Sequence, residues 1–181
     1  MIKESVGIEG IWLFQSKINI DTRGYLVEWF KESTARDVIG DNFALKQGNL
    51  SKSAKGVLRG IHFSLAPEGQ KKWITCVSGS VLDLIVDLRP KSPTFKKSIQ
   101  IPLSSGDGKA ILIDQQLGHA ILSLEDNTVV SYLLTSPYSP KNEFGINPFD
   151  PELEIVWPKM EFILSEKDKS APMLADIINS L

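Results

Sequence analysis

The stretch Ser80-Val81-Leu82-Asp83-Leu84-Ile85-Val86-Asp87-Leu88 carries the clearest structural signal in this chain of 181 residues. Successive side chains of a strand point to opposite sides, so its even-numbered residues share one face and its odd-numbered residues share the other. Both faces are partly apolar, and Asp83 and Asp87 lie on the same one. A strand that is apolar on both faces is covered on both sides. The pattern therefore predicts a central β-strand over residues 80–88.

The two aspartates of this strand allow two interpretations. A carboxylate inside a barrel costs several kcal/mol unless it has partners, so a pair of them favours a polar cavity in the interior. Alternatively, Asp87 pairs with Arg89 at the strand end while Asp83 faces solvent. The sequence favours the cavity and leaves the second interpretation open.

Short apolar segments separated by turn residues continue on both sides of this strand. Many short strands at this spacing predict an all-β fold, and we expect a cupin-type jelly-roll barrel with a few short helices. No repeat or linker divides the chain, which predicts a single domain over residues 1–181. The helices expected are Ser33–Ile39 and Pro172–Ser180, with Pro172 in the first turn. The other strands expected are Gly10–Gln15, Tyr25–Trp29, Ala44–Leu50, Val57–Phe63, Lys71–Val77, Lys96–Ile101, Lys109–Ile113, Ala120–Leu124 and Thr128–Leu134.

Composition narrows the classes of function. Twenty basic and 22 acidic side chains give a net charge of −2, which offers no broad basic surface for nucleic acid or anionic lipid. No apolar run reaches the 18 residues of a membrane span, and the first residues lack the pattern of a signal peptide. Cys76 is the only cysteine, so an intramolecular disulfide is excluded, and its apolar surroundings predict a buried, inert thiol. We expect a cytoplasmic protein.

The two histidines, His62 and His119, are the first candidates for chemistry. By the period of two, His62 shares a face with Leu58 and Gly60, and Arg59 lies on the other face. A neutral histidine is the usual general base at pH 7, but a core histidine bonded to the backbone fits the same pattern. The histidines are far apart in sequence and lack a His-x-His pair, so no metal site is expected.

Other catalytic and binding motifs are missing from the sequence. No Gly-x-Ser-x-Gly turn or glycine-rich phosphate loop occurs. A phosphate would therefore be held by side chains such as Arg23, Arg59 and Lys72, although each of these taken singly also fits an ordinary surface charge. The aromatic residues Trp12, Phe14, Trp29 and Phe30 fit either a core or an interface between subunits.

A series of motifs runs in order from about residue 10 to the C-terminus. They are Asp21–Phe30, Gln47–Ser51, Gly56–Phe63, Lys72, Val77–Arg89, Ser92–Phe95, Gly118–Ala120, Tyr132, Tyr138, Asp150-Pro151, Trp157-Pro158 and Leu164–Asp168. Together these motifs resemble the dTDP-4-dehydrorhamnose 3,5-epimerase family of sugar-nucleotide epimerases. The resemblance implies a cupin-type jelly roll, a homodimer, and neither metal nor dissociable cofactor.

The resemblance also implies a substrate and a set of roles. The substrate is a nucleoside diphosphate, expected to be dTDP, linked to a 4-keto-6-deoxy-hexose. The implied catalytic residues are His62 as general base, Asp168 as the carboxylate that orients it, Tyr132 as general acid, and Lys72 beside the keto oxygen. The implied substrate-binding residues, some of them supplied across the dimer interface, are Arg23, Glu28, Gln47, Asn49, Arg59, His119 and Tyr138.

Carbonyl chemistry agrees with these implied roles. A ketone at C4 acidifies the hydrogens on C3 and C5, so inversion needs only removal of a proton and its return to the opposite face. The enolate intermediate carries charge on O4, which Lys72 would stabilise as a fixed cation. We therefore expect an isomerase that inverts both C3 and C5.

Three alternatives remain open. The segments Asp114–Ile121 and Ser131-Tyr132 look more like the branch of the family that epimerises deoxysugars for secondary metabolites, in which a single centre, C3 or C5, is inverted. A sugar-nucleotide-binding cupin without catalysis is a second alternative. A metal-dependent cupin enzyme is the third, although its ligands are not evident.

Overall fold

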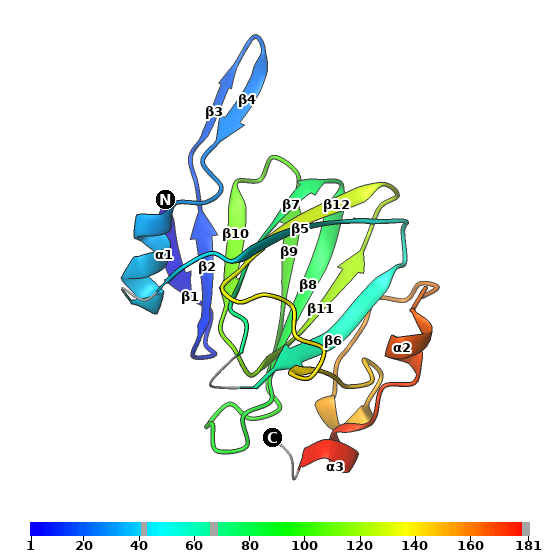
Figure 1. The fold of residues 1–181 in the computed structure, drawn as a ribbon. Coiled ribbons are helices and arrows are strands. Elements are labelled where there is room, and N and C mark those ends of the chain that lie inside the picture. Colours follow the sequence, from blue (N-terminus) through cyan, green and yellow to red (C-terminus); the bar gives the residue numbers. More distant parts are fainter. Residues whose placement is uncertain (41–42, 66–68, 179–181) are drawn as a thin grey trace.

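The secondary structure is mainly antiparallel β-strand in the computed structural model, which describes residues 1–40, 43–65 and 69–178 (Figure 1). The strands are β1 (Ile2–Ser5), β2 (Ile11–Gln15), β3 (Ile18–Asp21), β4 (Gly24–Val27), β5 (Gln47–Ser53), β6 (Leu58–Ser64), β7 (Lys72–Ser78), β8 (Ser80–Asp87), β9 (Ser98–Ser104), β10 (Lys109–Ile113), β11 (Leu117–Ser123), β12 (Thr128–Leu134) and β13 (Glu143–Gly145). The helices are α1 (Glu32–Ile39), α2 (Glu166–Lys169) and α3 (Leu174–Ile177), with a 3₁₀ turn η1 at Pro151–Leu153. The all-β prediction is confirmed.

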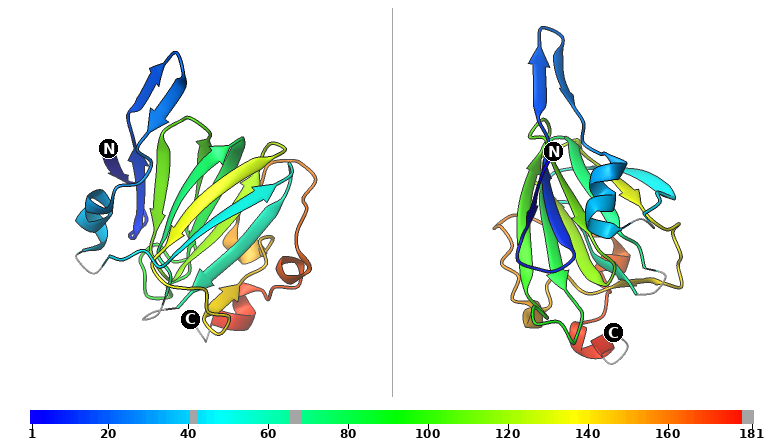
Figure 2. Two further views of the ribbon diagram at one scale, coloured as in Figure 1. Left: turned by 45° about the horizontal axis from the view of Figure 1, so that its top comes forward. Right: turned by 90° about the vertical axis from the view of Figure 1, so that its left-hand side faces the viewer.

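Two sheets face each other and form the jelly roll (Figures 1 and 2). One sheet has the strand order β1-β2-β10-β7-β12-β5 and the other has the order β13-β6-β11-β8-β9. Apolar side chains of both sheets, such as Ile74 and Ile85, fill one end of the space between them. Strand β8 lies inside its sheet between β11 and β9, as its two apolar faces predict.

The outer faces of both sheets are also covered, which explains why so many strands are apolar on both sides. Helix α1 packs over Phe14 and Trp73 of the six-stranded sheet. The chain beyond β13 covers the five-stranded sheet, where Ile146, Leu153 and Leu174 pack against β6, β8 and β11. The early aromatic residues Phe14, Trp12, Trp29 and Phe30 all belong to the cluster under α1, so they serve a core.

Most predicted elements are present, with shifted ends. Helix α1 and strands β10 and β12 match the predicted segments closely. The strand expected at Ala44–Leu50 begins only at Gln47, and the one expected at Tyr25–Trp29 ends at Val27. The helix expected over Pro172–Ser180 is limited to Leu174–Ile177; its expected end at residues 179 and 180 lies outside the described residues. Strands β1, β3 and β13 and helix α2 were not predicted, since each has only three or four residues.

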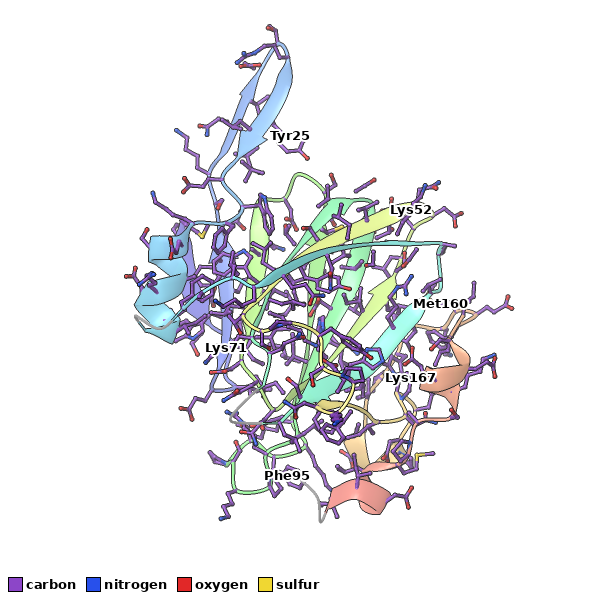
Figure 3. All side chains as sticks on the ribbon, viewed as in Figure 1. Tyr25, Lys52, Lys71, Phe95, Met160 and Lys167 are labelled. Carbon is purple, nitrogen blue, oxygen red and sulfur yellow. The ribbon has the colours of Figure 1, made fainter. Side chains whose placement is uncertain are left out.

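The hairpin of β3 and β4 projects away from both sheets (Figures 1 and 2). Its turn falls within the predicted Asp21-Thr22-Arg23-Gly24 segment. Ile20 and Leu26 are exposed by 80% and 72%, an unusual state for large apolar side chains at the tip of a free arm. Tyr25 lies on the same hairpin (Figure 3). An arm with this composition is typical of a segment that packs against another surface.

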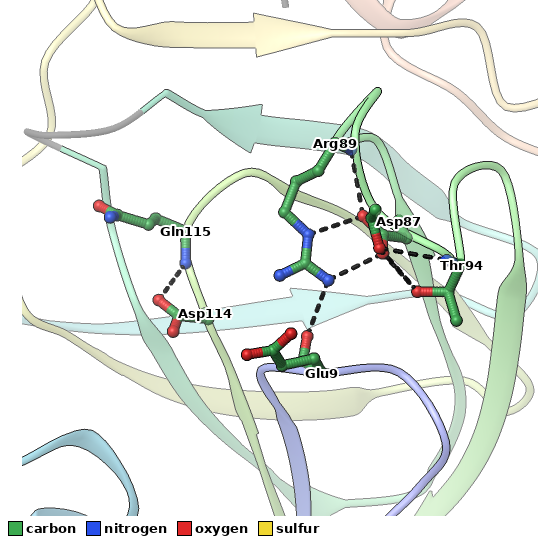
Figure 4. Close-up of polar contacts among 7 residues, drawn as sticks. Glu9, Asp87, Arg89, Thr94, Asp114 and Gln115 are labelled. Atoms are coloured by element: carbon green, nitrogen blue, oxygen red, sulfur yellow. Dashed lines mark hydrogen bonds and ion pairs between the residues drawn. The ribbon is translucent and has the colours of Figure 1, made fainter.

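The two aspartates of β8 have different environments, and each early interpretation holds for one of them. At the strand end, Asp87 accepts hydrogen bonds from Arg89 and Thr94 (Figure 4). It accepts a further one from the hydroxyl of Ser92. Burial alone would raise the pKa of Asp87, but these donors outweigh it and lower the pKa to about 2. Asp83, in contrast, does not face solvent: its residue is completely buried. The expected interior polar position is confirmed for Asp83.

Two smaller predictions can be assessed. Cys76 is buried, and burial is the main cause that raises the pKa of its thiol to about 11, so it is present as an unreactive thiol at neutral pH. No helix among the described residues has the length and apolar character needed to cross a membrane.

Candidate active site

A cavity of about 580 Å³ opens between the two sheets at the end that the apolar core leaves free. This volume is in the range of sites that take small ligands and cofactors. Strands of both sheets and the segment around α2 form its wall. The lining residues with polar side chains are Gln47, Asn49, Ser51, Arg59, His62, Gln70, Lys72, His119, Tyr132, Tyr138, Glu143, Ser165, Lys167 and Asp168.

A β-bulge in β6 brings Arg59 and His62 to the same face. Strict alternation predicted them on opposite faces, and that prediction is wrong. His62 pairs with His119 of β11 and Arg59 pairs with Ile121, so two residues of β6 lie where β11 has one. Gly60 occupies the bulge at φ +120°, and an added Cβ would lie 2.5 Å from the carbonyl oxygen of His119. Only glycine fits there.

His62 is held by a carboxylate from α2. Its Nε2 lies 2.6 Å from Oδ1 of Asp168, whose side chain is nearly buried, whereas the imidazole is one-third exposed to the cavity. Ser165 begins the helix, and its hydroxyl accepts a hydrogen bond from the backbone N–H of Asp168. Since a carboxylate only accepts, Nε2 of a neutral His62 carries the proton and Nδ1 carries the lone pair. This arrangement is typical of an oriented general base.

The environment of His62 lowers its pKa. Burial is the main cause, because it disfavours the imidazolium, and the positive charges of Lys72 and Lys167 act in the same direction. The hydrogen bond and charge of Asp168 oppose these effects and raise the pKa. His62 is therefore neutral, and able to take up a proton, at neutral pH.

Tyr132 and Lys72 belong to the opposite sheet. Tyr132 lies on β12 and Lys72 on the neighbouring strand β7. The residue of β7 opposite Tyr132 is Ile74, and Lys72 is two residues away from it on the same face. Both side chains line the cavity. A ligand between the sheets thus has His62 on one side and Tyr132 on the other. This geometry suits removal of a proton from one face of a molecule and its return to the other.

Lys72 is half-buried at the cavity wall and forms no ion pair within 4 Å among the residues that the structure describes. Burial lowers its pKa, while the negative charges of Glu143 and Asp83 raise it in part. Burial likewise raises the pKa of Glu143, against the effects of Lys72 and Lys167. A cation without a direct protein partner, in a cavity of this size, can stabilise an anionic oxygen of a ligand.

His119 has its own carboxylate. It lies opposite His62 in register, is nearly buried, and its Nε2 is 2.9 Å from Oδ2 of Asp83. The cavity is therefore lined by two histidines on adjacent strands, each bonded to a carboxylate, and the His119 pair is the more enclosed of the two.

The remaining predicted residues form the rim. Gln47 donates to Asn49 and accepts from the backbone N–H of Tyr138, which is 57% exposed. Arg59 bonds Ser53 and the carbonyl oxygen of Lys52, and so connects β6 to β5 at the cavity mouth.

The structure adds five polar wall residues that the sequence did not single out: Ser51, Gln70, Glu143, Ser165 and Lys167. Figure 3 shows Lys167 on the side of the molecule where α2 lies close to β6. Ser51 had a usable signal, because it continues the alternation of Gln47 and Asn49 along β5. Glu143 had none, since β13 has only three residues.

Arg23 and Glu28 do not reach this cavity. Arg23 lies at the tip of the β3–β4 hairpin, with its side chain 87% exposed and paired with Asp21. Glu28 follows the hairpin and pairs with Lys31. Within one chain, both are separate from the residues that line the cavity.

Among the described residues, no group of three histidine, cysteine, aspartate or glutamate side chains has an arrangement suited to a metal ion. The expectations of no metal and no cofactor stay predictions.

Comparisons with known proteins agree on one family. The profile of the dTDP-4-dehydrorhamnose 3,5-epimerase family matches residues 5–176. A protein of Mycolicibacterium smegmatis with that same name is 41% identical over 97% of this chain and 87% of its own length. A Streptomyces protein named dTDP-4-dehydro-6-deoxyglucose 3-epimerase is 43% identical over 94% of this chain and 87% of its own length.

Solved structures show the same fold. The crystal structure of a 3'-monoepimerase from Streptomyces bikiniensis, in complex with dTDP-quinovose, superimposes with a TM-score of 0.93. It is 40% identical and the match covers 97% of this chain and 89% of that one. The similarity thus extends over both sheets and the cavity between them.

Proposed function

The chain belongs to the dTDP-4-dehydrorhamnose 3,5-epimerase family, and we propose that it inverts C3 and C5 of a dTDP-linked 4-keto-6-deoxy-hexose. It is an isomerase. The observation that carries the proposal is the placement of His62 and Tyr132 on facing sheets of one cavity, with Lys72 beside Tyr132. Epimerisation next to a ketone needs a base on one face of the sugar, an acid on the other, and a cation at the ketone oxygen.

The first step is deprotonation. Nδ1 of His62 takes the proton from C3 or C5, and the electron pair of the broken C–H bond moves toward the carbonyl. This forms a carbon–carbon double bond and places negative charge on O4. Lys72 stabilises the enolate because its ammonium group has no competing ion pair within 4 Å among the described residues.

The second step is protonation from the opposite face. The Tyr132 hydroxyl gives its proton to the same carbon, the electrons return from O4, and the ketone is restored with the centre inverted. His62 then loses its proton and Tyr132 regains one through solvent, which completes the cycle. Asp168 holds the ring of His62 in the required tautomer throughout.

The rim residues fit the nucleotide part of this substrate. Arg59 and Lys167 supply positive charge for a diphosphate. The exposed ring of Tyr138 offers a flat apolar surface for a base. Gln47, Asn49 and His119 provide polar contacts to the sugar and the nucleoside in this proposal.

Epimerisation at C3 alone is the second candidate function. The specific observation in its favour is that the 43% identical Streptomyces protein is named a 3-epimerase. The same base and acid serve either outcome, since the two centres flank one ketone.

Proton NMR in deuterium oxide with dTDP-4-keto-6-deoxy-glucose tests the proposal. Deuterium entering at both C3 and C5, with inverted products after reduction, supports the double epimerase. Label at C3 alone supports the second candidate. Folded protein that introduces no deuterium at either carbon contradicts both.

The pH dependence of kcat/KM should follow the protonation of His62, whose pKa depends on Asp168. A base acts in its neutral form, so kcat/KM should fall as the pH drops through the lowered pKa of His62, below its ordinary value of 6.5. Asp168→Asn removes the contributions that raise this pKa. We expect its acid limb at still lower pH and its kcat reduced by about 10²-fold, because the ring loses its orientation.

A pH–rate profile of wild type and Asp168→Asn measures both effects. Glu166→Gln is the matched control, because Glu166 lies on the same helix with its side chain 91% exposed. A shift of the acid limb to higher pH in Asp168→Asn, or an equal effect in Glu166→Gln, would contradict the prediction.

We propose further that the active form is a homodimer in which Arg23 and Glu28 complete the site of the neighbouring subunit. The exposed apolar side chains of the hairpin and the distance of its tip from the cavity of its own chain support this proposal.

We also propose that residues 1–181 form a single domain. A cytoplasmic location stays a prediction.

Mixing two inactive variants tests the exchange of hairpins. His62→Ala and Arg23→Ala dimers are each expected to have little activity. In a mixed dimer, one cavity has an intact His62 and receives an intact Arg23 from its partner, whereas the other cavity has both defects. Activity should therefore reappear after subunit exchange, as measured by product formation. If Arg23 served its own chain, neither cavity would be intact and mixing would restore nothing.

A further inference from the structure

Asp83 is a charged residue in an apolar part of the fold. It lies in the middle of β8, and its two neighbours on the same face, Val81 and Ile85, belong to the core between the sheets. The residue has no exposed surface. Burial of a carboxylate is unfavourable unless several donors compensate for it.

The donors at Asp83 are too few for a purely structural role. Asp87, four residues later on the same face, accepts hydrogen bonds from Arg89, Ser92 and Thr94. Asp83 accepts one, from Nε2 of His119, and its Oδ1 has no partner among the residues that the structure describes. Asp87 is thus compensated by the strand end, whereas Asp83 is not.

The uncompensated charge of Asp83 acts on Lys72. Asp83 raises the pKa of this lysine, against the larger effect of burial. The other titratable or charged groups that line the cavity are Glu143 of β13, Arg59 and His62 of β6, His119 of β11, Tyr132 of β12, Tyr138 after β12, and Lys167 and Asp168 of α2. Of these, Glu143 also favours the ammonium form of Lys72, but Glu143 itself is only half-buried.

We propose that Asp83 is a positioning residue for the epimerase reaction: it fixes the tautomer of His119 and keeps Lys72 charged at the enolate oxygen. The first part follows from the 2.9 Å contact, since a carboxylate accepts only from a protonated Nε2. The second follows from a buried carboxylate with one unpartnered oxygen, bonded to His119, which lines the same cavity as Lys72. This second part rests on the proposed function, whereas the first does not.

Nitrogen NMR of the histidine rings tests the first part without substrate. The chain has only two histidines, so the spectrum is simple to assign. In the wild-type protein, neutral His119 should carry its proton on Nε2, and in Asp83→Asn this preference should be lost. A neutral His119 protonated on Nδ1 in wild type would overturn the proposal, and this measurement needs no variant to fold.

Steady-state kinetics of Asp83→Asn test the second part. Removal of the negative charge should lower the pKa of Lys72, so the basic limb of the kcat profile should move to lower pH by about one unit. At the optimum, kcat should fall about tenfold or more while KM changes by less than about threefold, because the lost effect belongs to the enolate.

Asp87→Asn is the matched control, with the same chemical change on the same face of the same strand. This variant should have a lower melting temperature, because it weakens the hydrogen bonds that Asp87 accepts. The basic limb of its kcat–pH profile and its histidine spectrum should stay as in wild type. If Asp83→Asn behaves like Asp87→Asn, Asp83 is structural and the proposal is wrong. An inactive wild-type protein would instead refute the proposed function, and the ring spectrum would still decide the role of Asp83 toward His119.

Discussion

His62→Ala is expected to lower kcat by about 10³- to 10⁴-fold, the largest effect of any single substitution in this site. The base is lost completely, since Asp168 holds the imidazole and is itself too enclosed to replace it. The substitution removes a side chain that is one-third exposed to a cavity, so the fold should persist. Deuterium incorporation into the substrate should disappear together with product formation, because no proton is removed.

Added imidazole offers a positive control for this variant. The space left by the His62 ring opens to the cavity, so free imidazole should enter and restore part of the activity. The same addition should not help Tyr132→Phe, whose own base is intact. Substantial turnover by pure His62→Ala without imidazole would show that the base is another residue.

Tyr132→Phe is expected to separate two reactions that the wild type couples. His62 still removes and returns the proton on its own face, so exchange of substrate hydrogens with deuterium oxide should continue. Inversion needs a proton from the opposite sheet, and product formation should fall by about 10²-fold. Parallel measurement of exchange by NMR and of inverted product after reduction gives both rates from one sample.

Tyr25→Phe is the control for the loss of a tyrosine hydroxyl. Tyr25 lies on the β3–β4 hairpin, and its hydroxyl contacts Ser105 outside the cavity. This variant should exchange and invert at the same ratio as wild type. If Tyr132→Phe also keeps that ratio, the proton on the second face comes from another donor.

The fold could be predicted from the sequence because its signals are local. Alternation of side chains and the turn residues between strands locate the long strands, and the two apolar faces of β8 indicate its central position. The same rule failed for β6, where Gly60 forms a bulge and places Arg59 beside His62. A bulge depends on pairing with a strand distant in sequence, so alternation within β6 gives no sign of it.

The candidate site was predictable where the side chain itself suggests chemistry. His62 and Lys72 attract attention as an imidazole and a cation in otherwise apolar strands, and the resemblance supplied their proposed roles. Asp168 has no such signal, because a four-residue helix brings it to His62 across more than a hundred residues of sequence. Asp83 gave a partial signal: its face was predictable, but its partner His119 was not.

The bulge at Gly60 has a consequence for how chain length can vary in such a protein. Deletion of one of the two residues between Arg59 and His62 would leave them two apart, and regular alternation would then keep both at the cavity. At the present length, a side chain at position 60 would disfavour the bulge, and His62 or Arg59 would turn into the outer core against the C-terminal segment. Variants of this barrel should therefore tolerate a shorter β6 at this point better than they tolerate a larger residue in place of Gly60.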